Sequence, residues 1–208
     1  MTKALISIDY TIDFVADEGK LTAGKSAQAI FERIAQVTQE AFENGDYIFF
    51  AIDGHEKGDE FHPEAQLFPS HNIIGTQGRD LYGPLADFYQ KHKGHARVRW
   101  MDKRHYSTFS GTDLDVRLRE RSVDTVVLMG VLSDICVLHT AIDAYNKGYC
   151  IEVVSSAIAA LTEENHQFAL NHLLTICVMY SVRQSLINSI VTSLWTGFSF
   201  FTNRNLYK

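Results

Sequence analysis

The stretch TVVLMGVLSDICVLHTAIDAYNKG, residues 125–148, contains the pattern that decides the fold. Residues 125–131 are almost entirely apolar, which is typical of a strand buried on both faces of a sheet. A short polar turn follows, and residues 136–148 then have the pattern of a helix that Gly148 ends. A buried strand that leads directly into a helix indicates a parallel sheet covered by helices.

The same alternation extends outward from this stretch in both directions. Helical spacing of apolar residues begins after Ser26 and after Thr162, which are suitable N-caps, and Gly45 is a suitable stop. We therefore expect an α/β fold, a three-layer, doubly wound (Rossmann-like) arrangement. The further strands are predicted at 4–9, 47–53, 96–103 and 149–157, and the further helices at 26–44, 113–121 and 162–173.

Length and composition indicate one domain in the cytoplasm. The chain has 208 residues, a formal charge of −6 and only three cysteines, Cys136, Cys150 and Cys177. A sparse, odd set of cysteines is typical of a reducing compartment rather than of a disulfide framework. The negative charge argues against a nucleic-acid partner, which needs a basic surface. Asp9 interrupts the first apolar run too early for a signal peptide, and no stretch before residue 173 could span a bilayer.

Residues 173–208 differ in composition from the rest of the chain. They contain no acidic residue and three basic ones, so all 25 acidic residues lie in 1–172. The segment is apolar, but Arg183, Gln184 and Asn188 interrupt it, which argues against a membrane span. We expect a domain over 1–172 and an atypical tail, a closing helix and edge element that is part of the same domain or partly flexible.

Polar residues follow the predicted strands at the places where the strands end. These residues are Asp9, Asp53 with His55, Lys103 and the turn at 130–136. In open parallel sheets, ligands bind beyond the carboxyl ends of the strands. We therefore expect these side chains to lie close together and to form the functional site.

A metal site is predicted from Asp53, His55, Glu64 and His71. The last two lie in the stretch 54–81, which is too long for a plain connection and is therefore expected to be functional. Two imidazoles with two carboxylates suit zinc, manganese or iron rather than calcium. His62, beside Pro63, is a weaker candidate. The alternative is a set of polar loop side chains in solvent.

Cys136 is the candidate nucleophile. If Ser133 or Asp134 caps the following helix, the thiol lies in the first helical turn, where the helix dipole should lower its pKa. Backbone amides at the same place could donate to an oxyanion. The alternative is a cysteine packed as a small apolar residue, an interpretation that suits Cys150 and Cys177.

A reactive thiol needs a base, and no histidine is obviously placed to serve, since His139 would point elsewhere on the helix. The carboxylate of Asp9 could accept the proton if burial raises its pKa. Lys103 would stabilise the thiolate. Taken singly, Asp9 could be a strand-end cap and Lys103 a solvated charge, but with Cys136 they form a coherent set.

The chain resembles the isochorismatase-like cysteine hydrolases, and within them the nicotinamidases (pyrazinamidases). The resemblance covers about residues 4–172, and its motifs are IDYTIDF, AIDGHEKGDEFHPE, FPSHNIIGTQG, DKRHYSTFSGTDL and GVLSDICVLHTAIDAYNKGY. It implies a six-stranded parallel sheet and a cis peptide bond at Val131–Leu132. It also implies a triad of Cys136, Asp9 and Lys103, and a divalent metal on the four residues named above. We expect this metal to be Zn²⁺, with Mn²⁺ or Fe²⁺ as the alternatives.

The resemblance further implies hydrolysis of nicotinamide to nicotinate and ammonia through a cysteine thioester, a reaction of NAD salvage. The ring nitrogen of the substrate would bind the metal, and the backbone amides of Leu132 and Cys136 would form the oxyanion hole. Phe14, Phe68 and Tyr106 are candidates for packing on the ring, although any of them could instead be core. Members of this family are often homo-oligomers.

Two positions depart from the family pattern: Thr11 replaces a usual glutamine, and Asn72 stands where many members have cysteine. Three alternative functions remain open at this point. The chain could be a related amidase for a carbamoyl or ureido compound, or a hydrolase in which a metal-bound hydroxide attacks and Cys136 is incidental. It could also be a binding module without catalysis.

Overall fold

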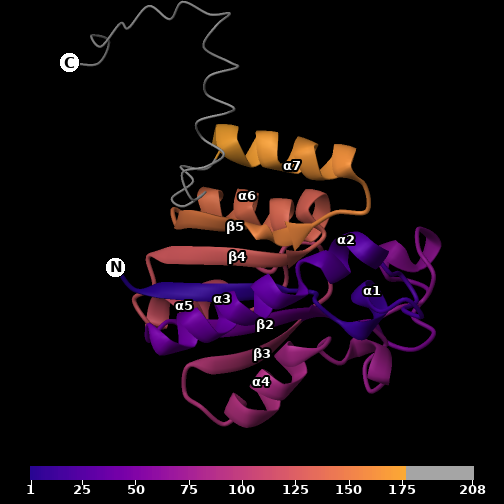
Figure 1. Cartoon of the computed structure of the whole chain (residues 1–208), viewed down its shortest axis with the longest axis horizontal. Coiled ribbons are helices and arrows are strands. Elements are labelled where there is room, and N and C mark those ends of the chain that lie inside the picture. Colours follow the sequence, from indigo (N-terminus) through magenta and orange to yellow (C-terminus); the bar gives the residue numbers. More distant parts are fainter. Residues whose placement is uncertain (177–208) are drawn as a thin grey trace, which may run out of the picture.

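The computed structural model describes residues 1–176, which contain a parallel sheet with helices on both faces (Figure 1). The sheet has five strands in the order β3-β2-β1-β4-β5, and every neighbouring pair is parallel. This confirms the predicted α/β class and all five strands located from sequence. The strands are β1 (Lys3–Ile8), β2 (Tyr47–Asp53), β3 (Val98–Lys103), β4 (Thr125–Val131) and β5 (Cys150–Ala159).

The expectation of six strands is not met in the described part of the chain. Residues 1–176 contain five strands, and the regular structure that follows β5 in this range is helical. The predicted tail begins inside a helix, since residues 173–176 complete α7 (Glu163–Ile176). The edge element expected after it, and Cys177, lie outside the described residues.

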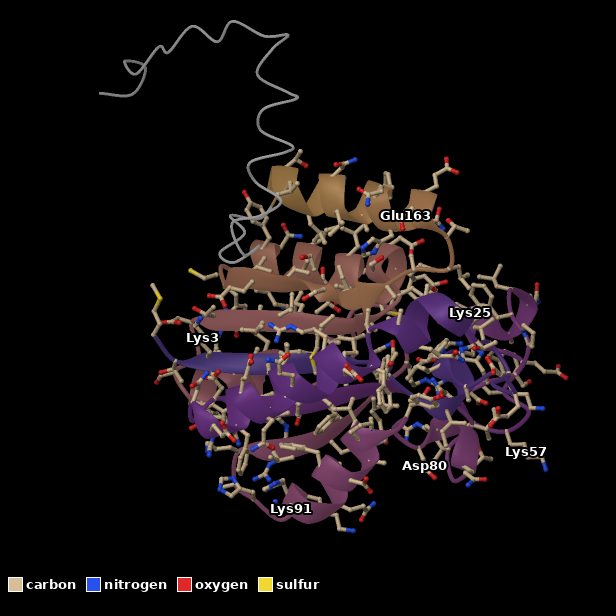
Figure 2. All side chains as sticks on the ribbon, viewed as in Figure 1. Lys3, Lys25, Lys57, Asp80, Lys91 and Glu163 are labelled. Atoms are coloured by element: carbon tan, nitrogen blue, oxygen red, sulfur yellow. The ribbon has the colours of Figure 1, made fainter. Side chains whose placement is uncertain are left out.

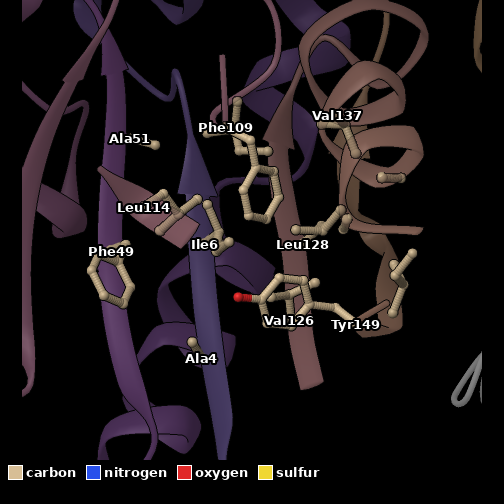
Figure 3. Packing of buried hydrophobic residues seen from close by; sticks show 14 of the residues in the cluster. Ala4, Ile6, Phe49, Ala51, Phe109, Leu114, Val126, Leu128, Val137 and Tyr149 are labelled. Carbon is tan, nitrogen blue, oxygen red and sulfur yellow. The ribbon is translucent and has the colours of Figure 1, made fainter. Parts of the chain in front are cut away.

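Helices cover both faces of the sheet, and a separate apolar core lies between the sheet and the helices on each face. Strand residues alternate between the two, so that Ile6 and Phe49 pack on one side and Leu5 and Phe50 on the other. Figure 3 shows the first core, where Leu114 and Tyr149 lie against the sheet, while charged side chains such as Lys91 lie on the outside in Figure 2. The first core is closed by α5 (Leu114–Glu120), α6 (Leu138–Asn146) and α7, and the second by α2 (Gly24–Ala29), α3 (Phe31–Glu43) and α4 (Pro84–His92).

The helix predicted over 26–44 is wrong in its first part, because two helices occupy this range. α2 begins at Gly24, and the chain bends at Ile30 before α3 begins. Ser26 is therefore not an N-cap; it lies inside α2 and donates hydrogen bonds to the carbonyls of Ala23 (2.9 Å) and Ala160 (2.6 Å). Gly45 does end α3, with φ +90°.

The turn after β4 also differs from the prediction. Residues Ser133–Val137 form a π-helical turn, η3, and α6 begins only at Leu138. The hydroxyl of Ser133 contacts His166 Nδ1 on α7 at 3.1 Å instead of capping the turn. Cys136 thus lies inside a wide turn rather than at the start of an α-helix. None of the helices in residues 1–176 is both long and apolar enough to cross a membrane.

Candidate active site

The three residues predicted to form a triad meet at the carboxyl ends of β1, β3 and β4. Lys103 Nζ lies 2.8 Å from Asp9 Oδ2 and 3.7 Å from Cys136 Sγ. All three residues are buried, and Lys103 also donates to the carbonyl of His105 at 3.2 Å. The structure therefore brings together a thiol, a carboxylate and an ammonium from three separate strand ends.

Backbone geometry explains how these strand ends come so close. Gly130 has φ +119°, and a Cβ at this position would lie 2.0 Å from the carbonyl oxygen of Ile8. Only glycine lets β4 pass β1 at this distance. Asp9 has φ +54°, and its Oδ1 accepts a hydrogen bond from the amide of Asp53 at 2.7 Å. The peptide bond Val131–Leu132 is cis, as the family resemblance predicts.

Burial governs the protonation of the triad. Burial raises the pKa of the Cys136 thiol well above its usual value, although Lys103 opposes the shift. The expectation of a lowered pKa is wrong, because desolvation of the buried sulfur is the largest effect on it and Cys136 lies in the π-helical turn rather than in the first turn of an α-helix. Burial likewise raises the pKa of Asp9 against the effect of Lys103, as expected for a buried base. Burial would lower the pKa of Lys103, but Asp9, Cys136 and Asp53 raise it, so that the ammonium stays charged.

The four predicted metal ligands form one cluster. Asp53 ends β2, His55 follows it, and Glu64 and His71 return from the long loop, so that one ligand atom of each lies within 4.8 Å of the others. His55 Nε2 lies 2.6 Å from Asp53 Oδ2. His71 Nε2 lies 3.4 Å from Asp53 Oδ2 and 3.6 Å from Glu64 Oε2.

The donor set fits a divalent cation. His71 Nδ1 contacts the carbonyl of Pro69 at 2.8 Å, which leaves Nε2 as the free ring nitrogen toward the carboxylates. This nitrogen is buried and has no hydrogen-bond partner among the described residues. Burial would raise the pKa of Asp53, but the charge of Lys103 and the contact of the His55 ring with this carboxylate outweigh that effect and lower the pKa, so that Asp53 is ionised. Two nitrogen and two carboxylate donors suit zinc, manganese or iron.

His62 lies outside this cluster but supports it. Its Nδ1 accepts a hydrogen bond from the amide of Glu64 at 3.2 Å, and its Nε2 contacts the carbonyl of Arg104 at 2.7 Å. His62 thereby caps the short 3₁₀ helix η1 (Pro63–Gln66), which carries Glu64. The weaker metal candidate is thus a buried capping residue.

A pocket lies between the triad and the metal ligands. All three predicted ring-packing residues line it, and the ring of Phe14 lies edge-on to His71 at 5.2 Å between centroids. Sequence reasoning missed the apolar residues Leu21, Ile135 and Leu161, since nothing in their local sequence distinguishes them from core or surface leucines and isoleucines. The complete lining is Phe14, Leu21, Asp53, Glu64, Phe68, Lys103, Tyr106, Val131, Leu132, Ile135, Cys136 and Leu161.

Comparisons with known proteins bear on this site. A sequence model of the isochorismatase domain matches residues 3–184. The chain belongs to the isochorismatase family. An isochorismatase family protein of Bacillus subtilis is 54% identical over 172 residues, which cover 83% of this chain and 94% of that protein.

Solved structures place this chain near one branch of the isochorismatase family. The pyrazinamidase/nicotinamidase of Streptococcus mutans is 74% identical with a TM-score of 0.85, and the match covers 86% of this chain and all of that one. The nicotinamidase/pyrazinamidase of Bacillus subtilis is 50% identical with a TM-score of 0.84 over the same shares. The predicted resemblance to the nicotinamidases is confirmed, and the chain is an amidohydrolase of this family.

The two residues that depart from the family pattern, Thr11 and Asn72, contact each other. Thr11 Oγ1 donates to Asn72 Oδ1 at 2.9 Å, and the amide of Asn72 donates to Asp13 Oδ2 at 2.7 Å. Asn72 is fully buried with φ +44°, a conformation that asparagine tolerates better than most residues. The pair therefore holds the backbone directly beside His71.

Proposed function

We propose that this amidohydrolase is a nicotinamidase, which hydrolyses the carboxamide of nicotinamide, and of pyrazinamide, to the acid and ammonia. The observation that carries the proposal is one pocket that is lined by Cys136, by the candidate metal ligands Asp53 and Glu64, and by aromatic rings. A flat aromatic amide suits such a pocket. The names of the similar solved structures support the same substrate class.

In the proposed mechanism, Asp9 removes the proton from the Cys136 thiol, and the thiolate attacks the carboxamide carbon. The raised pKa of Asp9 makes this carboxylate a stronger base, and the ammonium of Lys103 stabilises the thiolate that forms. Asp9 then gives its proton to the departing ammonia, leaving a thioester on Cys136. A water activated by Asp9 cleaves the thioester, releases the acid and restores the thiol.

The oxyanion formed in both steps needs donors. Leu132 and Cys136 both line the pocket, and the carbonyl of Leu132 accepts hydrogen bonds from the amides of Ile135 and Val137 at 3.1 Å each. These bonds fix the turn in which the amides of Leu132 and Cys136 lie. We assign those two amides to the oxyanion, an effect of about 3–4 kcal/mol per donor in comparable enzymes.

Asp53, His55, Glu64 and His71 would hold a divalent cation, for which Zn²⁺ is our first choice and Mn²⁺ or Fe²⁺ the alternatives. When bound, the cation would hold the ring nitrogen of the substrate and so orient the carboxamide. Phe14, Phe68 and Tyr106 pack on the ring in this proposal. From the reaction and the sequence we also propose a role in NAD salvage, a cytoplasmic location, and no nucleic-acid or membrane partner. The proposed homo-oligomer rests on the family resemblance alone.

The proposal is tested by ammonia release from nicotinamide. Cys136→Ala removes the nucleophile, so we expect release to fall by at least about 10³-fold. The matched control is Cys150→Ala, which removes the exposed cysteine of β5 and should leave the rate within twofold. Treatment with a chelator should abolish release, and added Zn²⁺ or Mn²⁺ should restore it.

Three results would overturn parts of the proposal. Release that survives Cys136→Ala would refute the thiol mechanism and favour hydrolysis that depends on the metal residues alone. Release from carbamoyl or ureido compounds, without release from nicotinamide, would change the substrate. Absence of release from every small amide, with nicotinamide still bound, would favour a binding module.

A further inference from the structure

Arg79 is a buried cation outside the pocket that the mechanism above does not use. It ends the short 3₁₀ helix η2 (Gln77–Arg79), at the far end of the long loop, and it is only 8% exposed. Its Nε donates to the carbonyl of Asp53 at 2.8 Å, and its Nη2 donates to the carbonyl of Ile52 at 3.1 Å. The same Nη2 contacts Asp102 Oδ1 at 2.5 Å. One guanidinium thus joins the ends of β2 and β3.

Gly54 and Trp100 leave space for this guanidinium and pack against it. A Cβ on Gly54 would lie 3.0 Å from Arg79 Nη2, so a side chain there would crowd it. The ring of Trp100 lies 5.2 Å from Arg79 Cζ, and its Nε1 donates to Asp102 Oδ1 at 2.6 Å. The indole therefore orients the carboxylate and covers the guanidinium.

The strand ends that Arg79 joins carry two groups of the site. Asp53 and Lys103 are register partners in the β2–β3 pair, and the amide of Gly54 donates to the carbonyl of Lys103 at 2.9 Å. On the pocket side, Lys103 Nζ lies 3.7 Å from Asp53 Oδ1. A change in the separation of these strand ends would move a metal ligand and the triad lysine relative to each other.

We propose that Arg79 is a positioning residue that holds Asp53 and Lys103 in their working separation. It acts through the backbone, since it donates to the carbonyl of Asp53 and does not line the pocket. The planar, forked guanidinium suits this task because it serves two carbonyls and a carboxylate at once, which an ammonium does not do with the same geometry. The catalytic part of this inference rests on the proposed function.

The test compares Arg79→Met with a matched control, Arg97→Met. Arg97 lies at the opposite end of β3, just before Val98, and its Nη1 donates to the carbonyls of Phe42 at 3.0 Å and Asp46 at 2.9 Å. It also lies over the ring of Phe42 at 4.7 Å. Removing Arg97 therefore removes a similar set of contacts far from the site. Each variant is measured for kcat and KM, for Zn²⁺ affinity by competition with a chromophoric chelator, and for Tm.

We expect Arg79→Met to lower kcat on nicotinamide by about 10²-fold, because a small displacement of reacting groups lowers the rate by about this factor. It should also weaken Zn²⁺ binding about tenfold, because loss of a residue that orients a metal ligand typically lowers metal affinity by at least this factor. Arg79→Lys should recover part of both losses. Arg97→Met should lower Tm but keep kcat and Zn²⁺ affinity within about twofold of wild type, as expected for contacts remote from the chemistry. A folded Arg79→Met protein with wild-type kcat and affinity would overturn the proposal. Equal losses in Arg97→Met would also overturn it.

Hydrogen exchange at the Gly54 amide tests the proposal without substrate or metal. This amide bonds to the carbonyl of Lys103, so it reports the junction of β2 and β3 directly. Its exchange should accelerate in Arg79→Met and remain unchanged in Arg97→Met. If Arg79→Met does not fold, Asp102→Asn, which keeps both carbonyl contacts and removes the charged partner, should accelerate the same amide to a smaller degree. Unchanged exchange in the folded variants would refute the role of Arg79 even if nicotinamide proves not to be the substrate.

Discussion

At the residue scale, the site depends on one ammonium shared by three acidic groups. Lys103 Nζ lies 2.8 Å from Asp9, and 3.7 Å from both Cys136 and Asp53. Burial alone would favour the neutral form of each acid. The lysine compensates this cost, so that Asp53 remains a carboxylate and the thiolate of Cys136 has a counter-charge when it forms. Removing Lys103 should therefore affect stability as well as activity.

We predict that Lys103→Met lowers the free energy of unfolding of the metal-free protein by about 3–5 kcal/mol, because it leaves buried carboxylates unpaired. The control is Lys3→Met, which breaks the part-exposed pair of Lys3 with Glu152 (2.7 Å) and should cost at most about 1 kcal/mol. Urea denaturation at neutral pH measures both. Equal costs in the two variants would contradict the central role assigned to Lys103.

Sequence alone could predict which side chains of the site lie close together, but not their pKa values. Asp9, Lys103 and Cys136 were predictable because each follows or ends an apolar strand, and parallel strands end at one edge of a sheet. The pKa of Cys136 was not predictable, because it depends on how deeply the turn is buried. The pairing of Thr11 with Asn72 and the contacts of Arg79 were equally hidden, since they join residues far apart in sequence.

At the element scale, the π-helical turn η3 places Cys136, the proposed nucleophile. β4 delivers the chain to Gly130, and the wide turn Ser133–Val137 then presents Cys136 toward Asp9 and Lys103 before α6 begins. The strands were predictable to within two residues because their apolar runs are continuous. The π-turn was not, because the same apolar residues suit an α-helix. α4 was missed, although Pro84 at its start and Lys91 and His92 in its last turn are suitable signals.

We predict that Gly130→Ala destabilises the fold by about 3 kcal/mol or more, since the new methyl group would clash with the carbonyl of Ile8 and φ is +119°. Gly148 provides the control. It has φ +81°, and a methyl group at this position would have no atom within 4 Å, so Gly148→Ala carries only the conformational cost of about 1–2 kcal/mol. Thermal and urea unfolding compare the two. A smaller loss in Gly130→Ala than in Gly148→Ala would contradict the close approach of β4 to β1.

At the scale of the whole molecule, both the sheet and the long loop supply residues to the site. The strand ends supply Asp9, Asp53, Lys103 and the turn with Cys136, and the loop supplies Glu64 and His71. The loop is tied back to the sheet at its far end by Arg79. The layered fold, and the position of the site at the carboxyl ends of the strands, were predictable from the alternation of strands and helices. The path of the loop was not, because it has little regular structure.

The central claim is that Cys136 carries the acyl group during turnover. The most direct measurement mixes the metal-loaded protein with excess nicotinamide, quenches the reaction in acid within the first turnover, and determines the intact mass and the modified peptide. We predict one nicotinoyl group, bound as a thioester to Cys136, with Cys150 unmodified. Turnover of nicotinamide with Cys136 unmodified at every quench time would contradict the mechanism.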